Sequence, residues 1–358
     1  MTDETFMRRV LELAERGRGA TAPNPMVGCV IVKSGQILAE GWHRCDGEAH
    51  AEAEALAQLA EGGCAGADVY VNLEPCAHVG RTPACASLLV DAGVRRVVVA
   101  IRDPDRRTSG RGIEILREAG IEVQEGVLAK EAESLNRGYL SRQQHGRPFV
   151  RVKTAASIDG RICLENGASK WISGAPARRL VQQMRTDSCA VATGSGTVVA
   201  DDPQLTVRDV PVAQQPLRVL FDSRLRSSPG ARIFAGGRVV VFTAVAGRED
   251  FAPGVELVQM ADSQDKVDLV GSLAWLAEHK KCNEVLVEGG AGLVGALLGH
   301  DLVDEMVSFI APVVFGSGQA LAHMSPIERL DDATRFQLSE LEQIGDDIKA
   351  VFSRNRQP

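Results

Sequence analysis

The sequence predicts a chain of two α/β domains, each with a sheet that is covered by helices. Three observations support this prediction. The 358 residues are more than one ordinary hydrophobic core organises. Runs with strand character alternate with runs of helical periodicity, which is typical of a sheet with helices on its faces. The stretch 142–148 (Arg-Gln-Gln-His-Gly-Arg-Pro) is polar and lies between a predicted helix and a predicted strand. We therefore expect the domains to comprise residues 1–146 and 147–358.

The composition narrows the class of protein. The apolar and charged fractions, 44% and 24%, are ordinary for a soluble globular protein. No apolar run approaches the roughly 18 residues of a transmembrane helix, and the first residues lack the order of a signal peptide. We therefore expect a cytoplasmic protein that keeps its cysteines as reduced thiols or ligands and does not bind a membrane. The 40 basic and 47 acidic residues give a net charge of −7, which argues against a nucleic acid as partner.

The alternation of strands and helices can be followed through the first domain. Asp3 is expected to cap the first helix, whose apolar side holds Phe6, Val10, Leu13 and Ala14. The further elements expected are strands at Met26–Val32, Ile37–Trp42, Asp68–Leu73, Arg95–Ile101 and Ile121–Glu125, a hairpin turn at Lys33–Gln36, and helices from His50, at Ala84–Ala92, at Gly112–Ala119 and at Lys130–Gln144.

The second domain continues the same alternation. Its expected strands are Phe149–Ala156, Cys189–Thr193, Leu217–Asp222, Arg238–Thr243 and Glu284–Glu288. Its expected helices are one that carries Leu180, Val181 and Met184, one at Val267–His279, and one that opens after Glu288.

One histidine and two cysteines in the first domain form a pattern of zinc ligands. Cys76 and Cys85 stand at the ends of a loop that reads Cys-Ala-His-Val-Gly-Arg-Thr-Pro-Ala-Cys, and His50 precedes them. Three such ligands leave the fourth tetrahedral position open for water, as in catalytic zinc sites. Glu52 follows His50 by two residues and Pro75 precedes Cys76, which is the signature of zinc deaminases, whose carboxylate moves protons and is not a ligand. The sequence therefore predicts a catalytic zinc site with Glu52 as general acid and base.

The surroundings of this pattern give more detailed expectations. The short helix from His50 is expected to bury Ala53, Leu56, Ala57 and Ala60. Cys85 opens another helix, whose N-terminus is expected to lower the pKa of this thiol. His78 is expected to be a loop residue or to contact the substrate. Two alternatives stay open. In the first, the cysteines are merely buried apolar residues. In the second, the zinc is structural and the C-terminal half merely binds a nucleotide, which a fourth ligand at Cys64 or His78 would favour.

Two glycine-rich turns between a strand and a helix indicate phosphate binding in the second domain. They are Gly194-Ser195-Gly196 and Glu288-Gly289-Gly290-Ala291-Gly292. Glycines let the backbone approach an anion, and a helix N-terminus offers free N–H groups. Neither turn has the full dinucleotide-binding fingerprint, because the first lacks a third glycine and we expect no acidic residue at the right strand end. A purely structural role for each turn is the alternative.

Several motifs together resemble the bifunctional riboflavin-biosynthesis deaminase/reductase family. Eight residues separate Cys76 from Cys85, where most zinc deaminases have two, and segment 22–28 reads Ala-Pro-Asn-Pro-Met-Val-Gly. Segments 169–171 (Ser-Lys-Trp), 201–208 (Asp-Asp-Pro-Gln-Leu-Thr-Val-Arg) and 288–290 (Glu-Gly-Gly) resemble the reductase half. Ala84 is a departure, because the family usually has a second proline there. The resemblance covers essentially the whole chain.

This resemblance implies a cytidine-deaminase-like α/β/α domain followed by a dihydrofolate-reductase-like α/β domain that uses NADPH. The implied substrate is 2,5-diamino-6-ribosylamino-4(3H)-pyrimidinone 5′-phosphate. Zinc-activated water would replace its 2-amino group while Glu52 moves the proton, and NADPH would then deliver hydride to C1′ of the ribose to give the ribityl chain. No residue stands out as the proton donor of the second step. The implied assembly is a homo-oligomer, with a dimer favoured.

The resemblance also assigns residues to the two sites. The residues implied to hold NADPH are Ala155, Trp171, Thr197, Asp201, Ser223, Gly290, Ala291, Gly292 and Leu293. The residues implied to hold the substrate are Asn24, Ser169, Arg185, Leu205, Arg208 and Glu288. The two arginines suit a phosphate because a guanidinium is always charged and binds bidentately, although most arginines are solvated surface residues. Asn24 taken alone reads as a turn residue, and Trp171 is equally compatible with the core.

One rival from another class is a nucleoside or tRNA deaminase with an unrelated C-terminal module. The acidic balance of charge and the eight-residue gap between the cysteines argue against it.

Overall fold

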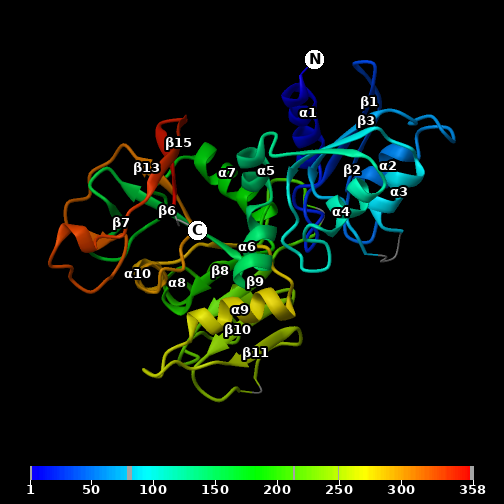
Figure 1. Ribbon diagram of the computed structural model, residues 1–358. Helices are drawn as coiled ribbons and strands as arrows, with labels where there is room; N and C mark the ends of the chain where they lie inside the picture. Colours follow the sequence, from blue (N-terminus) through cyan, green and yellow to red (C-terminus); the bar gives the residue numbers. More distant parts are fainter. Residues whose placement is uncertain (1, 79–82, 213, 249, 355–358) are drawn as a thin grey trace. The chain divides into compact units, whose positions relative to one another are not determined.

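The computed structural model describes residues 2–78, 83–212, 214–248 and 250–354. The chain forms two compact units, Met1–Gly146 and Arg147–Pro358. Each unit has its own sheet (Figure 1). Each also has its own apolar clusters. Part of the loop between the two zinc-pattern cysteines, 79–82, lies outside the described residues. In the described part of the chain, no helix has the length and apolar character to span a bilayer.

The first unit is built on a five-stranded mixed sheet in the order β2-β1-β3-β4-β5. Its strands are β1 (Gly28–Lys33), β2 (Gln36–Trp42), β3 (Asp68–Leu73), β4 (Arg96–Ile101) and β5 (Glu122–Glu125). Strand β1 is antiparallel to both its neighbours, whereas β3, β4 and β5 are parallel. Ser34 and Gly35 close the β1–β2 hairpin with positive φ angles of 52° and 77°, which suits a tight two-residue turn.

Helices cover both faces of this sheet. They are α1 (Asp3–Glu15), α2 (Ala51–Leu56), α3 (Cys85–Asp91), α4 (Arg111–Glu118), α5 (Ala129–Leu135) and α6 (Arg137–His145). Alternate residues of β1 point to opposite faces, so that Ile31 packs with residues of α2, α3 and α4 while Val30 packs with residues of α1, α5 and α6. The unit is therefore a three-layer α/β/α sandwich.

Two local expectations at helix starts are wrong. The N-cap of α1 is Thr2, which accepts the N–H of Thr5, whereas the carboxylate of Asp3 pairs with Arg96 of β4 at 2.6 Å. Helix α2 has only six residues, with His50 as its N-cap, and it buries the face that carries Glu52. The face predicted through Ala53, Leu56, Ala57 and Ala60 is half-buried or exposed, because the helix ends before a second turn reaches the core.

The expected helix Lys130–Gln144 is also wrong, because α5 and α6 are separated at Asn136. The side chain of Asn136 accepts the N–H of Met26 at 2.8 Å and donates to its C=O at 2.9 Å. This pairing satisfies two backbone groups that precede β1 and therefore favours the break.

The second unit contains a nine-stranded sheet in the order β11-β10-β9-β8-β12-β6-β13-β16-β15. Its strands are β6 (Phe149–Ser157), β8 (Ala190–Gly194), β9 (Leu217–Phe221), β10 (Val239–Thr243), β11 (Val255–Gln259), β12 (Glu284–Val287), β13 (Glu305–Ala311), β15 (Gln337–Ile344) and β16 (Asp347–Ser353). Strands β7 (Arg161–Leu164) and β14 (Gly318–Ala320) form a separate pair.

The strands from β11 to β13 are all parallel, and β16 is antiparallel to both its neighbours, β13 and β15. The helices of this unit are α7 (Ala175–Thr186), α8 (Ser195–Asp201), α9 (Leu269–His279) and α10 (Ala291–Gly299). Because parallel strands share the direction of their chains, the carboxyl ends of β6, β12, β8 and β9 lie side by side at one edge. Ligands of such sheets bind at that edge.

Candidate active sites

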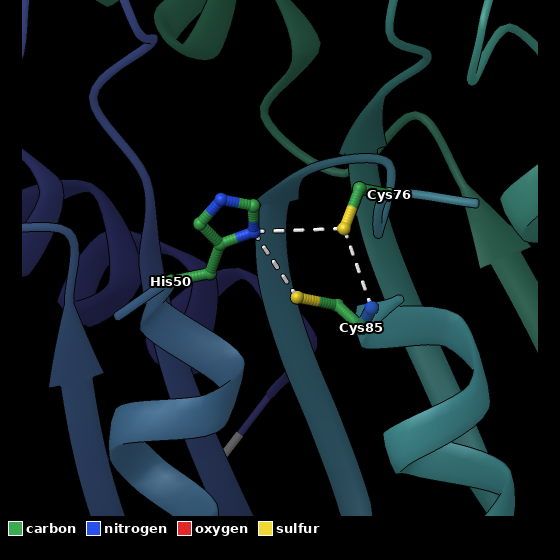
Figure 2. Close-up of side chains that lie close together, drawn as sticks. All are labelled: His50, Cys76 and Cys85. Carbon is green, nitrogen blue, oxygen red and sulfur yellow. Dashed lines mark hydrogen bonds between the residues drawn. The ribbon is translucent and has the colours of Figure 1, made fainter. Parts of the chain in front are cut away.

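His50, Cys76 and Cys85 come together in the first unit, as the sequence pattern predicts. Their ligand atoms all lie within 4.8 Å of one another. Nδ1 of His50 is 3.3 Å from Sγ of Cys85 and 3.5 Å from Sγ of Cys76 (Figure 2). The histidine is the N-cap of α2, Cys85 is the first residue of α3, and Cys76 lies in the loop after β3. One imidazole and two thiolates fit a zinc ion and leave a coordination position for water.

The thiols of the cluster are strongly perturbed. The pKa of Cys76 is lowered to about 4 because this sulfur receives hydrogen bonds from Cys85 and His50. It also accepts the first backbone N–H of α3, that of Cys85, at 3.3 Å. The pKa of Cys85 is raised by its neighbour Cys76 and by burial. The expectation that the helix N-terminus lowers the pKa of Cys85 is therefore wrong, because the N–H group of α3 points to the sulfur of Cys76.

Glu52 lies in the interior beside this cluster. It is 3% exposed, and burial followed by the negative charge of Cys76 raises the pKa of its carboxyl to about 7. Its carboxyl also contacts the side chain of Cys85. A carboxyl group with a pKa near neutrality can both accept and donate a proton at physiological pH.

Asn24 joins the cluster through a histidine that the sequence analysis missed. Its Nδ2 lies 3.2 Å from Nε2 of His43 and donates to Asp46 at 3.0 Å. Nδ1 of His43 is 3.0 Å from the carbonyl oxygen of Ala49, so that we assign its proton to Nδ1. The ring of His43 stands edge-on to that of His50, with 5.7 Å between centroids, and burial lowers the pKa of His43. No short motif contains His43, so only the folded chain reveals it.

A second missed residue, Glu74, holds the loop that carries Cys76. Its carboxylate is buried and accepts four backbone N–H groups at distances of 3.0 to 3.2 Å. The donors are Asp103, Gly110, Gly112 and Ile113, at and before the start of α4. This carboxylate therefore fixes the chain two residues before Cys76.

The alternative of a fourth protein ligand is not supported by the described residues. His78 lies 3.4 Å from the hydroxyl of Thr108, and Cys64 donates to the carbonyl of Ala92 at 3.6 Å. Neither belongs to the cluster.

The residues expected to hold NADPH gather at the carboxyl edge of the second sheet. Ala155 lies in β6, Gly290–Leu293 opens α10 after β12, Thr197 and Asp201 lie in α8 after β8, and Ser223 follows β9. Oγ1 of Thr197 accepts the N–H of Gly290 at 3.1 Å and so joins the two glycine-rich turns.

The turn at Gly290 fits an anionic cofactor. Gly290 is the N-cap of α10 and offers no side-chain acceptor to the first N–H groups of the helix. A Cβ atom added at Gly292 or Gly196 would meet no heavy atom within 4 Å, so both turns face open space. Free N–H groups at an open helix N-terminus suit a phosphate.

Ser169 and its neighbours lie against the end of α8. The hydroxyl of Ser169 is 3.5 Å from Oδ1 of Asp201, and Nζ of Lys170 is 3.4 Å from the same oxygen. Trp171 is 71% exposed, with the guanidinium of Arg178 4.7 Å from its ring centroid. The core alternative for Trp171 is therefore wrong.

Arg185 and Glu288, both expected to hold the substrate, bind each other. Nε and Nη2 of Arg185 donate to Glu288 at 2.5 and 3.0 Å, and Nη1 donates to the carbonyl of Thr206 at 2.8 Å. Three of the five N–H groups of this guanidinium are thus engaged. Burial by itself would raise the pKa of the Glu288 carboxyl. The positive charge of Arg185 outweighs this effect, with smaller contributions from Lys153 and Arg208, so that the pKa lies below its usual value.

Lys153 in β6 is a further residue that the sequence analysis missed. Its ammonium group lies in the interior, and burial lowers its pKa against the attraction of Glu288. Arg208 is exposed, and its backbone N–H is held by Gln182 at 2.8 Å. Leu205, three residues earlier, is buried and has a positive φ of 55°.

The two folds and their sites define a zinc-dependent deaminase joined to a reductase. Residues 1–101 match the family model of the cytidine and deoxycytidylate deaminase zinc-binding region, and residues 148–350 match that of the RibD C-terminal domain. The chain belongs to the RibD family of bifunctional riboflavin-biosynthesis enzymes.

Relatives of similar length support this assignment. The riboflavin biosynthesis protein RibD of Haemophilus influenzae is 42% identical, with 98% of this chain and 97% of the relative covered. The Escherichia coli protein of the same name is 41% identical, with 97% and 98% covered. A structure of Acinetobacter baumannii RibD is 41% identical and superposes with a TM-score of 0.91 over 99% of both chains. A diaminohydroxyphosphoribosylaminopyrimidine deaminase/5-amino-6-(5-phosphoribosylamino)uracil reductase from Thermotoga maritima is 36% identical, with a TM-score of 0.88 over 98% of both chains.

These similarities confirm the expected fold classes, the bifunctional enzyme class and the cofactors zinc and NADPH. The rival with an unrelated C-terminal module is wrong, because the second half matches the RibD C-terminal domain.

Proposed function

We propose that residues 1–146 deaminate the phosphorylated diaminopyrimidine and that residues 147–358 reduce the ribosyl chain of the product. The observation that carries this proposal is the cluster of His50, Cys76 and Cys85 with Glu52 beside it, in a chain that aligns with RibD proteins over nearly its whole length. The substrate would be 2,5-diamino-6-ribosylamino-4(3H)-pyrimidinone 5′-phosphate, and the final product 5-amino-6-ribitylamino-uracil 5′-phosphate.

In the deamination, His50, Cys76 and Cys85 would hold zinc and Glu52 would move the proton. When bound in such a site, zinc lowers the pKa of a water molecule and makes it a nucleophile. The carboxyl of Glu52, buried beside the cluster, would accept a proton from the attacking water and pass it to the leaving amine. Asn24 and His43, hydrogen-bonded to each other beside His50, orient the pyrimidine ring. Glu74 holds the loop that carries Cys76 in place, because its carboxylate accepts four backbone N–H groups.

In the reduction, the carboxyl edge of the second sheet would hold both NADPH and the ribose phosphate. When bound, NADPH supplies the hydride. Ala155, Trp171, Thr197, Asp201, Ser223 and the turn Gly290–Leu293 form the cofactor contacts. Reduction at C1′ opens the ribose ring, and its oxygen then takes up a proton. Lys153 can supply this proton, because its ammonium is buried beside Glu288 and has a lowered pKa.

The substrate contacts would divide into a phosphate-binding part and a ribose-binding part. Arg208 is exposed and lies near Glu288, which suits the phosphate. Arg185 keeps two N–H groups beyond those used by Glu288 and Thr206, so that it contacts the substrate while it orients Glu288. Ser169 and Leu205 complete the substrate site.

The proposed assembly is a homodimer in the cytoplasm. Strand β15 is an edge strand, and Leu338 and Leu341 on it are 50% and 64% exposed. Exposed apolar residues on an edge strand favour association with a second copy. All eight cysteines lie in the described part of the chain and none of them forms a disulfide, which suits a reducing compartment. Sedimentation of a Leu341→Glu variant tests the dimer, and a wild-type monomer would contradict it.

One experiment tests the two activities together. The chain is incubated with the diaminopyrimidine phosphate with and without NADPH, and the products are followed by mass. Without NADPH, the substrate should lose its amino group and gain oxygen. With NADPH, the product should gain two further hydrogens. A chain that leaves the diaminopyrimidine unchanged would contradict the proposed deamination.

A further inference from the structure

Two cysteines of the second unit lie side by side at the amino edge of its sheet. Cys189 directly precedes β8 and Cys282 lies two residues before β12, and these two strands are parallel neighbours. Because parallel strands begin at the same edge of a sheet, both thiols lie at the edge opposite to the turns that are proposed to bind NADPH. Neighbouring strands are only about 4.8 Å apart. The pair is separate from the zinc-pattern cysteines, which belong to the first unit.

Hydrogen bonds hold the two thiols against each other. The backbone N–H of Cys189 donates to the carbonyl oxygen of Glu284 at 3.1 Å, and the N–H of Asn283 donates to Sγ of Cys189 at 3.3 Å. Asn283 directly follows Cys282, so the second contact brings the side chain of Cys189 to the chain beside Cys282. The thiol of Cys282 in turn donates to the sulfur of Cys189. Two sulfurs that contact each other across neighbouring strands can be joined by a disulfide without a large movement of the backbone.

The two thiols differ in exposure and in acidity. Cys189 is partly exposed, whereas Cys282 is only 2% exposed. The hydrogen bond from Cys282, together with the N–H groups of Glu284 and Asn283, lowers the pKa of Cys189 to about 7 against the opposing effect of burial. Since the thiolate is the nucleophile in thiol chemistry, a partly exposed thiol with a pKa near neutrality reacts first. This difference suits Cys189 as the attacking thiol and Cys282 as the thiol that completes the reaction.

Among the described residues, two further cysteines outside the zinc cluster are partly exposed, and neither combines these properties. The pKa of Cys45 is raised by burial and by its acidic neighbours, which keeps the thiol protonated. Cys163 in β7 donates to the side chain of Gln319 at 3.6 Å. Cys76 and Cys85 also contact each other, but they belong to the zinc cluster.

We propose that Cys189 and Cys282 form a reversible oxidation site, at which a low-molecular-weight disulfide converts the two thiols into a protein disulfide. Cys189, as the thiolate, attacks one sulfur of the oxidant, forms a mixed disulfide and releases the first thiol of the oxidant. Cys282 then gives up its proton and attacks the sulfur of Cys189, which breaks the mixed disulfide and releases the second thiol. The protein loses two electrons and two protons, and the oxidant is reduced to two thiols.

The disulfide would join the starts of two strands in the middle of the sheet. Strands β8 and β12 are adjacent, and each leads at its other end into one of the glycine-rich turns. A crosslink between residues that are distant in the sequence restricts the unfolded chain. Oxidation should therefore stabilise the second unit against unfolding.

The test treats the zinc-loaded, full-length chain with 2-hydroxyethyl disulfide, a small neutral oxidant that can reach a partly exposed sulfur. The remaining thiols are then alkylated, and the cysteines are mapped by peptide mass. The variants are Cys189→Ser and Cys282→Ser. The matched control is Cys163→Ser, which removes a partly exposed cysteine of the same unit outside the pair. Thermal unfolding verifies that each variant is folded, and Cys282→Ala replaces a Cys282→Ser variant that does not fold.

In the wild type and in Cys163→Ser, the peptides of Cys189 and Cys282 should be joined, and dithiothreitol should separate them. Cys282→Ser should stop at the mixed disulfide on Cys189, because no second thiol is present to displace the reagent. Cys189→Ser should leave Cys282 unmodified, since its sulfur is buried. The oxidised wild type should unfold at a higher temperature than the reduced wild type.

Four outcomes would count against the proposal. Peptides of Cys189 and Cys282 that are alkylated separately in the treated wild type would show that the pair does not oxidise. A mixed disulfide on Cys282 in Cys189→Ser would reverse the roles of the two thiols. A disulfide confined to Cys76 and Cys85, with release of zinc, would assign the reactivity to the metal cluster. Equal unfolding temperatures of the oxidised and reduced chains would overturn the stabilising role of the disulfide.

Discussion

Arg185 and Glu288 form a bidentate ion pair in the interior of the second unit. Their side chains are 9% and 13% exposed, and two hydrogen bonds of 2.5 and 3.0 Å fix the plane of the carboxylate. Arg185 lies in α7, and Glu288 lies between β12 and the turn at Gly290. The pair therefore joins a helix to the turn that is proposed to bind the cofactor.

Breaking this pair from one side should destabilise the second unit. Arg185→Leu leaves the charge of Glu288 buried without its partner, which costs about 3–5 kcal/mol of unfolding free energy. Urea unfolding of the second unit measures this loss. The double variant Arg185→Leu, Glu288→Leu should regain most of the stability but not the reductase activity. A single variant as stable as the wild type would show that the pair does not hold α7 in place.

Removing any zinc ligand should remove the metal and the deaminase activity together. His50→Ala, Cys76→Ala and Cys85→Ala each leave two ligands, which hold zinc poorly, whereas reduction of a deaminated substrate should persist. Metal analysis and product mass measure the two effects. Cys45→Ala is the control, because Cys45 is also a free and partly exposed cysteine but lies outside the cluster. Full zinc occupancy in a Cys76→Ala, Cys85→Ala double variant would contradict the ligand assignment.

Glu52→Gln should keep zinc and the fold but lose deamination by about a hundredfold to ten-thousandfold, because glutamine cannot transfer a proton. The control is Glu54→Gln in the same helix, whose carboxylate instead pairs with Arg44 at the surface. Zinc content and deamination rate are measured for both variants. Loss of zinc from Glu52→Gln would identify the carboxylate as a ligand.

Arg208→Ala should weaken binding of the phosphorylated substrate far more than binding of NADPH. Losing one charge-assisted contact to a phosphate costs about 1.5–3 kcal/mol, roughly tenfold to a hundredfold in affinity. Separate titrations with NADPH and with substrate measure the two affinities, and Arg179→Ala, an exposed arginine of α7, is the control. A matched loss of NADPH affinity would mean that Arg208 binds the phosphates of the cofactor.

The stability of the first unit should depend on Asp103 in a pH-dependent way. Burial raises the pKa of this carboxyl to about 6, although it accepts hydrogen bonds from Tyr139 and the N–H of Asp105. Because the unfolded value is about 4, the stabilisation by the protonated form is complete below pH 4 and is lost as the pH rises through 6. Asp103→Asn should therefore raise the unfolding free energy at pH 8 by up to about 3 kcal/mol and change little at pH 4.

The contrasting variant is Asp105→Asn, because Arg107 lowers the pKa of Asp105. This variant should lose stability at pH 8, opposite in sign to Asp103→Asn. Urea unfolding at the two pH values measures both effects, and equal behaviour of the two variants would contradict the assignment.

The sequence predicted the cluster of the first unit well because its information is local. His50 and Glu52 share one short segment, the two cysteines bound another, and the chemistry of zinc restricts which residue types can stand there. His43, Glu74 and Lys153 were missed because their neighbours in the sequence are unremarkable. Their surroundings arise only when distant strands and loops pack together.

The same distinction holds for the fold. Strands β8, β9, β10 and β12 were predicted because each is a short, nearly continuous apolar run. Strand β13 was not predicted, although it is parallel to β6, because its residues alternate between buried and half-buried. Strand β15 was not predicted, because all its residues except Ile344 are exposed and only pairing with β16 defines it. The break at Asn136 was missed as well, because helical periodicity continues across it and the partner, Met26, is distant in the sequence.

The side-chain amides of Asn136 and Asn72 contact the segment before and at the start of β1, and Asn136 determines how long an isolated deaminase domain must be to keep these contacts. Asn136 covers both backbone polar groups of Met26, and Asn72 accepts the N–H of Gly28 at 2.8 Å. A fragment that stops at residue 101, where the match to the deaminase family ends, keeps all three zinc-pattern residues. It nevertheless lacks Asn136, so that the N–H of Met26 loses its partner, while Asn72 still donates to the carbonyl oxygen of Met26 at 2.9 Å. The module that can be transplanted, fused or expressed alone is therefore longer than the recognisable motif and extends through α6.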